Sequence, residues 1–463
     1  MGFVHRHISR PGLTIRLMWT GITRQPKNIK VTCNHKGLTH YGGILFFQEF
    51  LRVLQFRRVL AQRVEEFRLR HDYSLSQMTV AVMYPIILGL DRLENASLLR
   101  SDTTFHYLTG LPTYPDPQSL RRFLLHAPPE FRRRLHRFND WLLQQFIHRP
   151  EHRSRLILDL DSTVVTVFGL QEGAEVGYNP RYRGKRSYDP LLCLEANSSF
   201  LWDTELRPGN AGTWSDSPEL LACCFVSIPA DIREVRFRAD AGFGYHAVLE
   251  TLEQGHAQYA VVARMSNALK RRLGGLRYER LNPEWEIAEC EHRVSERAPA
   301  RRCIVARRPI EETEPQPTLF SLARYAYRAW LTNLPLSPAG VWHFYDGRAG
   351  MEPRIGELRE HFALRKIPTR AFEANALYLE MIRLAYNLVT AFQRTCLPAD
   401  WQDLTLKTLR YRLLWLPGEL TRPQNRPTLR LADSPVIRGW TEKTLHRIGK
   451  LKPLDAGGRH GGK

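Results

Sequence analysis

Residues 155–169 read RLILDLDSTVVTVFG, and this stretch decides the fold that the sequence predicts. Leucines stand at alternate positions from 156 to 160, while Asp159 and Asp161 project from the other face of the same segment. Alternation with period two, together with apolar and β-branched residues, predicts a central β-strand. Two unpaired carboxylates on one side of such a strand would be costly, so the pattern favours a metal site or a basic partner elsewhere in the chain.

The segments that follow predict a sheet covered by helices. Strands are expected at 189–197, 200–207, 233–243 and 257–264, and helices at 217–228 and 245–254. Asp240 falls where the strand at 233–243 becomes a loop. The order β-β-β-α-β-α-β is the skeleton of an RNase H-like domain, in which helices pack on a mixed sheet.

A second informative stretch, YDGRAGMEPRIGELR, spans residues 345–359. Four polar residues in it are spaced by three, four and seven positions: Tyr345, Arg348, Glu352 and Arg359. On one helical face such a set suits a phosphodiester, because a carboxylate can hold a divalent metal and guanidinium groups clamp phosphate oxygens. Pro353 and two nearby glycines argue against an unbroken helix, so the helix is expected to begin near Glu352. Taken alone, the motif could also be a solvated surface helix.

The composition favours a polyanionic partner. The 463 residues include 67 Lys or Arg against 47 Asp or Glu, a formal net charge of +20. Nucleic acid is the first candidate and a membrane surface the second, but the excess is mostly arginine, which favours phosphate recognition. No apolar run reaches about 18 residues, so no transmembrane helix is expected. With no apolar leader, and with Arg6 where a myristoylation motif needs Ser or Thr, the expected location is cytoplasmic, with the nucleoid.

The seven cysteines indicate neither a zinc ribbon nor a disulfide framework, because none forms a C-x-x-C pair and their number is odd. They are expected to be reduced thiols that pack as small apolar groups. Their positions are Cys33, Cys193, Cys223, Cys224, Cys290, Cys303 and Cys396.

An all-helical region is expected before the first strand. Residues 45–69 have apolar side chains at three- and four-residue intervals, and the apolar run at 76–90 predicts a buried helix that Pro85 interrupts. Asp116 and Pro117 form a helix start.

Arginines mark the outer faces of this region. Arg121 and Arg122 would lie on an exposed side of the helix that starts at Pro117, and the helix at 130–146 carries arginines opposite its apolar stripe. Such faces resemble those of a DNA-reading domain, although the solvated helices of a plain bundle would look similar.

The chain divides into six parts by composition and period. We expect a basic, flexible arm (1–40), a helical DNA-binding domain (41–150), the first part of the RNase H-like core (151–264), a β-rich insertion (265–322), the second part of the core with the Glu352 helix (323–396) and a basic C-terminal region (397–463).

With these motifs in place, the chain resembles the DDE transposases of bacterial insertion sequences. It is similar in particular to the group with a Y-(2)-R-(3)-E-(6)-K signature and a β-strand insertion before the last acidic residue. Tyr345, Arg348 and Glu352 match the first three signature positions. Arg359 stands at the Lys position, where it keeps the charge but changes the hydrogen-bonding geometry.

Further segments carry the same resemblance over roughly residues 40–395. LDLDST resembles the strand of the first catalytic Asp and selects Asp161, with Thr163 two residues on. RADAGF resembles the strand of the second and selects Asp240. The stretches at 89–110 and 374–388 are also similar to this group.

The resemblance implies a catalytic mechanism. Asp161, Asp240 and Glu352 would hold two Mg²⁺ ions, or Mn²⁺, because oxygen ligands suit these ions. Water would cut double-stranded DNA at the transposon ends, and the freed 3′-hydroxyl would attack target DNA. A homodimer would act on the DNA, and no membrane is involved.

The resemblance also implies DNA contacts. Arg348 and Arg359 would position phosphates near the cut, with Tyr345 bonding one of them. Trp285 and Trp330 are candidates for stacking a flipped base, against the alternative that both pack in the core.

Three alternatives remain open. Asp159 could replace Asp161 at the metal site. The chain could be a DNA-binding protein without catalysis, such as a transposase-derived repressor. It could also be an RNase H-fold nuclease that never joins strands.

Overall fold

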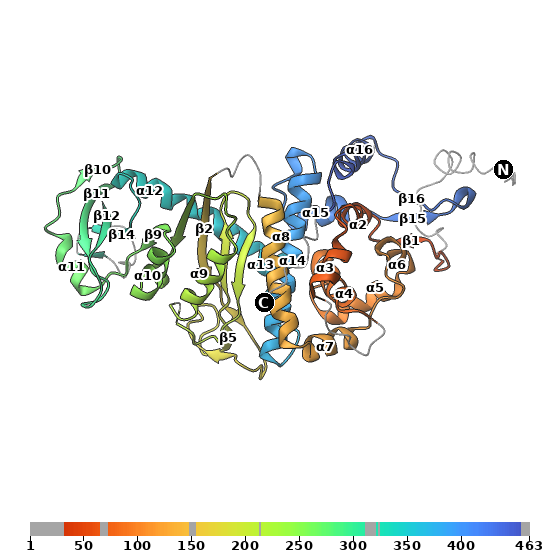
Figure 1. Cartoon of the computed structure of the whole chain (residues 1–463), viewed down its shortest axis with the longest axis horizontal. Helices are drawn as coiled ribbons and strands as arrows, with labels where there is room; N and C mark the ends of the chain where they lie inside the picture. The colour runs from red at the N-terminus through yellow and green to blue at the C-terminus, as the bar shows by residue number, and fades with distance from the viewer. Residues whose placement is uncertain are drawn as a thin grey trace, which may run out of the picture.

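The computed structural model describes residues 32–64, 73–147, 154–212, 214–310, 321–322 and 325–454. Most of the basic arm expected at 1–40, and the Gly-rich end of the chain, lie outside the described residues. Figure 1 shows an elongated molecule with a sheet toward one end, the helices α8 and α14 beside it, and the remaining N-terminal helices toward the other end.

A large mixed sheet carries most of the strands of the fold. Its order is β10-β11-β12-β14-β9-β8-β2-β6-β7, with β13 paired to β14. The bounds are β2 (Arg155–Ser162), β6 (Leu191–Glu195), β7 (Leu201–Glu205), β8 (Glu234–Ala239), β9 (Gln258–Val262), β10 (Glu279–Arg280), β11 (Glu286–His292), β12 (Arg301–Pro309), β13 (Ser321–Leu322) and β14 (Tyr325–Thr332). Strand β2 runs antiparallel to β6 and parallel to β8, and β8 runs parallel to β9.

The elements predicted from the sequence after residue 155 are confirmed. The leucines at 156, 158 and 160 are fully buried, which accounts for the central place of β2. The helices α9 (Ser217–Val226) and α10 (His246–Gln254) connect the later strands as expected.

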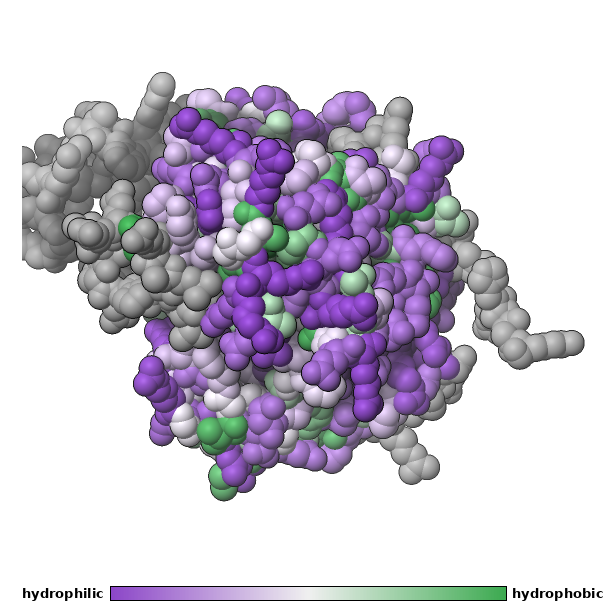
Figure 2. Space-filling view, turned by 90° about the vertical axis from the view of Figure 1, so that its left-hand side faces the viewer, coloured by the Kyte–Doolittle hydropathy of each residue, from purple (hydrophilic) through white to green (hydrophobic). Residues whose placement is uncertain are grey.

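The strands expected as an insertion at 265–322 extend this same sheet. Strand β14 pairs antiparallel with β9, with Leu331 opposite Val261, and β12, β11 and β10 continue the sheet beyond it. The helix α11 (Asn267–Leu273) precedes them and carries three basic residues in its last turn. Figure 2 faces this end of the molecule and shows a mostly hydrophilic surface on which apolar residues form small, separate patches.

The chain between β2 and β6 forms a small second sheet that was not predicted. It has the order β3-β5-β4, formed by β3 (Val165–Thr166), β4 (Glu175–Val176) and β5 (Arg186–Tyr188). We call residues 163–190 the flap.

The helix α14 (Phe372–Cys396) is buried along almost its whole length. It packs against strand β7 on one side and against N-terminal helices on the other. Buried residues of the N-terminal helices and of the sheet therefore belong to one continuous hydrophobic core. The N-terminal helices are α2 (Ile44–Val53), α3 (Phe56–Val64), α4 (Leu75–Leu88), α5 (Ser97–Ser101), α6 (Thr103–Thr109), α7 (Pro117–His126) and α8 (Pro129–Ile147).

Two expectations for these helices are wrong. The helix expected over 45–69 breaks into α2 and α3 at Gln55, whose φ of 53° lies in the left-handed region. Pro85 does not interrupt α4, which continues to Leu88. A proline removes the hydrogen bond to the carbonyl four residues earlier. That carbonyl belongs to Ala81, and the hydroxyl of Tyr114 donates to it instead.

The predicted start of α7 is confirmed, because the Asp116 side chain accepts a hydrogen bond from the Ser119 amide at 2.9 Å. The C-terminal region contains α15 (Leu406–Leu409), the strands β15 (Gly418–Thr421) and β16 (Thr428–Arg430), and α16 (Pro435–Gly449); of these, α16 packs on α2 and α15 packs on α13. Strand β15 pairs with β1 (Leu38–Thr39). Among the described helices, none has the length and apolar character needed to cross a bilayer. All seven cysteines are free thiols, and Cys33 and Cys223 are exposed.

Candidate active site

Asp161 and Asp240 lie side by side at the ends of two neighbouring strands. In the parallel pair β2 and β8, Leu160 is aligned with Ala239, so the next residue of each strand is one of the two aspartates. Both carboxylates line a cavity of about 1010 Å³, which we call the acidic cavity. The structure thus brings together two of the three predicted catalytic carboxylates.

The carboxylate of Asp161 has one ion-pair partner and one backbone hydrogen bond. Arg348 donates to its Oδ2 at 2.8 Å, and its Oδ1 accepts the Ser162 amide at 2.8 Å. Burial raises the pKa of Asp161 to about 6; Arg348 opposes this rise and the nearby Asp240 adds to it. A carboxylate that a neighbouring guanidinium does not fully stabilise has room for a further cation.

Asp240 is held by the turn that follows its strand. Its Oδ1 accepts the Gly242 amide at 2.9 Å in the short 3₁₀ turn Ala241–Phe243. This bond fixes one oxygen, and the side chain lines the acidic cavity.

Asp189 is a third carboxylate of this cavity, and sequence reasoning missed it. Arg207, which is buried, donates to its Oδ2 at 2.6 Å and to its carbonyl oxygen at 3.0 Å. Burial raises the pKa of Asp189, although Arg207 opposes the shift. In the sequence Asp189 precedes a proline at the start of a strand, which is the pattern of an ordinary turn.

Asp159 differs from Asp161 although it lies on the same face of β2. Arg238 on the neighbouring strand β8 binds both of its oxygens, at 2.6 and 2.8 Å, and both side chains are buried. Arg238 is therefore the basic partner that the sequence predicted for Asp159. Because it binds both oxygens, this carboxylate has no oxygen left for a metal. Arg238 also donates to the Phe344 carbonyl at 2.9 Å.

The stretch at 345–359 forms two helices joined by a tighter turn. The helix α12 (Pro338–Asp346) leads into the 3₁₀ helix η5 (Gly347–Gly350) and then into α13 (Met351–His361). The expected break before Glu352 is confirmed, and the expected proline in the first turn of the next helix is in place.

Two signature residues of this stretch lie close to the aspartates. Arg348 is 9% exposed and also donates to the Leu160 carbonyl at 2.9 Å. Burial raises the pKa of Tyr345 to about 12; Arg348 opposes this shift, whereas Asp240 and Asp161 add to it.

Arg359 lines the acidic cavity with Asp161 and Asp240, and burial lowers the pKa of its guanidinium. Glu352 is exposed in the first turn of α13 and forms no ion pair with another described residue. Its approach to Asp161 and Asp240 stays a prediction.

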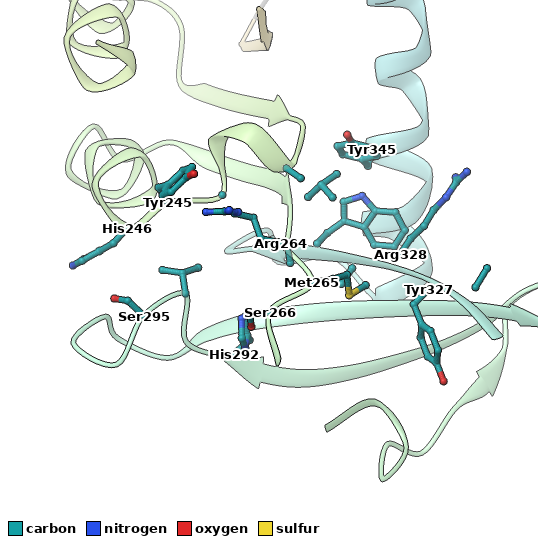
Figure 3. A pocket seen from close by; sticks show the side chains of 18 of the residues that line it. Tyr245, His246, Arg264, Met265, Ser266, His292, Ser295, Tyr327, Arg328 and Tyr345 are labelled. Atoms are coloured by element: carbon teal, nitrogen blue, oxygen red, sulfur yellow. The ribbon is translucent and has the colours of Figure 1, made fainter. Parts of the chain in front are cut away.

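A second cavity of about 1140 Å³ adjoins the acidic cavity, since Tyr245 lines both. Figure 3 shows Tyr245, Arg264, Arg328 and Tyr345 around it. The stacking candidates also line it: Trp285 is half-buried, and Trp330 is 2% exposed.

Trp330 packs within a small cluster of aromatic rings. Its ring centroid lies 5.7 Å from that of Tyr345 and 5.4 Å from that of Trp342. Burial and these neighbours fit the core-packing alternative for Trp330, whereas Trp285 keeps part of its surface free.

The flap adds aromatic and basic side chains to the rim of the acidic cavity. Phe168 is 77% exposed and Tyr178 is 82% exposed, and both line the cavity with Arg181. Sequence reasoning missed this surface, because the flap's strands are only two or three residues long.

The arginines predicted on outer helix faces differ in their surroundings. Arg122 is exposed, whereas Arg121 is half-buried, forms an ion pair with Glu94 and donates to the Pro368 carbonyl. On α8, Arg132 lies 3.3 Å from Glu373.

Comparison with known proteins adds the family. No curated protein matches the chain. One solved structure that does match is the piggyBac transposase synaptic complex with hairpin DNA; it has 12% sequence identity and a TM-score of 0.41, over 81% of this chain and 79% of that one. A family model described as "Transposase DDE domain group 1" matches residues 23–453, and the chain therefore belongs to this family of DDE transposases.

Proposed function

We propose that this transposase cuts DNA at transposon ends and joins the freed 3′ ends to target DNA, with Asp161, Asp240 and Glu352 as its catalytic carboxylates. The observation that carries the proposal is the adjacent placement of Asp161 and Asp240 at the ends of parallel strands, inside a cavity bordered by basic side chains. The finer assignment is to the insertion-sequence group with the Y-R-E-K signature, in which Arg359 takes the Lys position.

The fold we propose for the catalytic unit is RNase H-like. The first five long strands have the spatial order β7-β6-β2-β8-β9, so that the first lies in the middle and pairs in parallel with the fourth. The strands from β10 to β12 would then be the insertion that precedes Glu352.

The residues present fit a divalent cation. The available donors are carboxylate oxygens, which suit Mg²⁺ or Mn²⁺. Burial raises the pKa of Asp161 and Asp240 adds to the shift, although Arg348 opposes it, so a bound cation would favour the charged form of this carboxylate. Two such ions, when bound, supply an activated nucleophile and stabilisation of the leaving oxygen.

The chain's own residues position the DNA in this proposal. Arg359, Arg365 and Lys366 line the same cavity as the aspartates and can hold phosphate oxygens next to the cut. Arg348, through Asp161 and the Leu160 carbonyl, holds the first carboxylate in place. Tyr345, whose raised pKa keeps its hydroxyl protonated, can donate to a phosphate.

The flap would provide a further DNA contact. Its exposed Phe168 and Tyr178 offer apolar faces, and Arg181 offers charge, at the rim of the acidic cavity. Aromatic faces combined with basic groups favour a nucleic-acid strand. A homodimer on paired transposon ends is part of the proposal.

One reaction tests the function. The protein is incubated with Mg²⁺ and a labelled duplex that carries the transposon end, together with target DNA, and products are resolved as nicks, hairpins and joined strands. We expect cleavage and joined products that depend on the divalent ion. Binding without cleavage would favour a repressor, and cleavage without joining would favour a nuclease; either outcome rejects the proposal.

A salt titration of DNA binding accompanies this reaction. If phosphates supply most of the affinity, the logarithm of the binding constant falls by up to about 0.9 for each phosphate contact per tenfold rise in salt.

A further inference from the structure

A second group of metal-binding side chains lies away from the acidic cavity. His136 on α8, Asp203 on β7 and Cys223 on α9 each offer one donor atom, and the three donors lie within 4.8 Å of one another. They line a cavity of about 400 Å³ that also contains Glu205. Cys223 is exposed, so an ion can reach the group from solvent.

The imidazole of His136 is already oriented for a ligand role. Its Nδ1 lies 2.8 Å from Glu380 Oε1, and Asn139 donates to the other oxygen of Glu380 at 2.9 Å. A carboxylate on one ring nitrogen fixes the tautomer and leaves the second nitrogen to bind a metal. Here the second nitrogen is Nε2, which lies 3.6 Å from Asp140 Oδ2, and Nδ1 also lies 3.8 Å from Asp203 Oδ1.

Asp203 has one oxygen committed to the protein. Its Oδ1 accepts the Thr204 amide at 2.7 Å and lies 3.4 Å from the Arg383 guanidinium. The second oxygen of Asp203 can therefore take an added cation without disturbing these bonds.

The local charge also calls for a cation. Three carboxylates, from Asp140, Asp203 and Glu380, surround the fully buried guanidinium of Arg383. With a neutral His136 and the Cys223 thiolate of a metal site, the group carries three negative charges, which one divalent ion would reduce to one.

We propose that His136, Asp203 and Cys223 form a zinc site, with Glu205 or water as the fourth ligand. One nitrogen, one sulfur and carboxylate oxygen are the donor types that zinc takes, and a thiolate disfavours Mg²⁺. Tetrahedral zinc with bonds of about 2.0–2.3 Å places its donors about 3.5 Å apart, so the three side chains would close by about 1 Å. The ion would tie α8 to β7 and α9, and the proposal is independent of the catalytic one.

Cobalt provides the direct test, because a thiolate ligand gives Co²⁺ a charge-transfer band in the near ultraviolet that oxygen ligands do not. We expect the full-length reduced protein to show this band with one equivalent of Co²⁺ and to lose it when Zn²⁺ is added. Cys223→Ser should abolish the band. Cys33→Ser, which alters the other exposed cysteine, should retain it.

A second variant separates this site from the acidic cavity. In Asp161→Asn/Asp240→Asn the band and one tight zinc equivalent should remain. Zn²⁺ should raise the melting temperature of this variant by a few degrees, and Cys223→Ser should reduce the zinc affinity at least about tenfold.

Alternatively, a protonated His136 could supply the positive charge beside Asp140, Asp203 and Glu380 without any metal. The protein would then bind Co²⁺ without the charge-transfer band, or would show a band that Cys223→Ser leaves unchanged. Either result overturns the proposal. Since Cys223 is exposed, its replacement by serine should leave the fold intact, which the melting temperature without metal verifies.

Discussion

Carboxylates are buried at two places in this molecule, and the two places differ in how their charge is balanced. In the acidic cavity Asp161 is 19% exposed and faces open space, with Arg348 as its ion-pair partner. At the junction of α8, β7 and α14, the Arg383 guanidinium is 0% exposed and lies against three carboxylates. The first arrangement leaves a carboxylate open to a ligand in the cavity, whereas the second uses its acids, with or without the proposed zinc ion, to hold two layers of the fold together.

The largest expected effect is the loss of cleavage when one of the three proposed catalytic carboxylates is removed. Asp161→Asn, Asp240→Asn and Glu352→Gln should each abolish divalent-ion-dependent cleavage, a loss well beyond the roughly 10–100-fold typical of residues that only support a metal ligand. DNA binding, measured by gel shift, should remain within about threefold, because the basic side chains are unchanged.

The matched variant for this comparison is Asp203→Asn at the junction. It should cleave normally at temperatures where it is folded. If it were inactive while folded, or if the Asp161 or Asp240 variant cut normally, the separation of the two places into catalytic and structural would fail.

The next largest effect concerns stability. Arg383→Met leaves the buried Asp203 and Glu380 and the half-buried Asp140 without their guanidinium, and should lower the free energy of unfolding by about 3–5 kcal/mol. Arg348→Met should cost about 1 kcal/mol or less, because Asp161 can be hydrated from the cavity. Denaturant midpoints at constant slope measure both values. Equal losses of unfolding free energy in the two variants would show that water reaches Asp161 no better than it reaches the carboxylates of the junction.

The sequence predicted more of the acidic cavity than of the junction. Strand alternation placed Asp159 and Asp161 on one face of a strand, because short-range periodicity specifies which face a residue takes. The resemblance to DDE transposases then selected Asp161, together with Asp240 where the next parallel strand ends. The contacts that set their charge come from far along the chain: Arg348 lies 188 residues from Leu160, whose carbonyl it binds. No local pattern contains such a pairing.

The junction was beyond sequence reasoning for the same reason. His136 and Glu380 are 244 residues apart, and each reads locally as an ordinary polar residue of a helix. The continuation of α4 through Pro85 likewise depends on a distant residue, since the Tyr114 hydroxyl satisfies the carbonyl of Ala81 that proline cannot bond.

Asp159 sharpens the comparison, because it lies two residues from Asp161 on the same strand face yet forms a closed pair. Asp159→Asn keeps one acceptor for Arg238 but removes its charge partner, and should cost about 2–3 kcal/mol of unfolding free energy. Cleavage per folded molecule should be retained. Complete loss of cleavage in a stably folded Asp159→Asn protein would move Asp159 into the active site.

The smallest expected effect is a pH dependence of cleavage. Burial raises the pKa of Asp161 to about 6, so below this pH a proton occupies the carboxylate that should bind the cation. The cleavage rate should therefore fall by up to about tenfold per pH unit below about pH 6 and should level off above it.

Unfolding would not explain such a fall through Asp161. A carboxyl whose pKa is higher in the folded than in the unfolded chain favours folding as pH drops, because the folded state then binds more protons. Replacing Mg²⁺ by Mn²⁺ separates competition for the carboxylate from other causes, since a more tightly held cation displaces the proton at lower pH. The midpoint of the rate profile should shift downward with Mn²⁺, and an unshifted midpoint would assign the titration to a group that binds no cation.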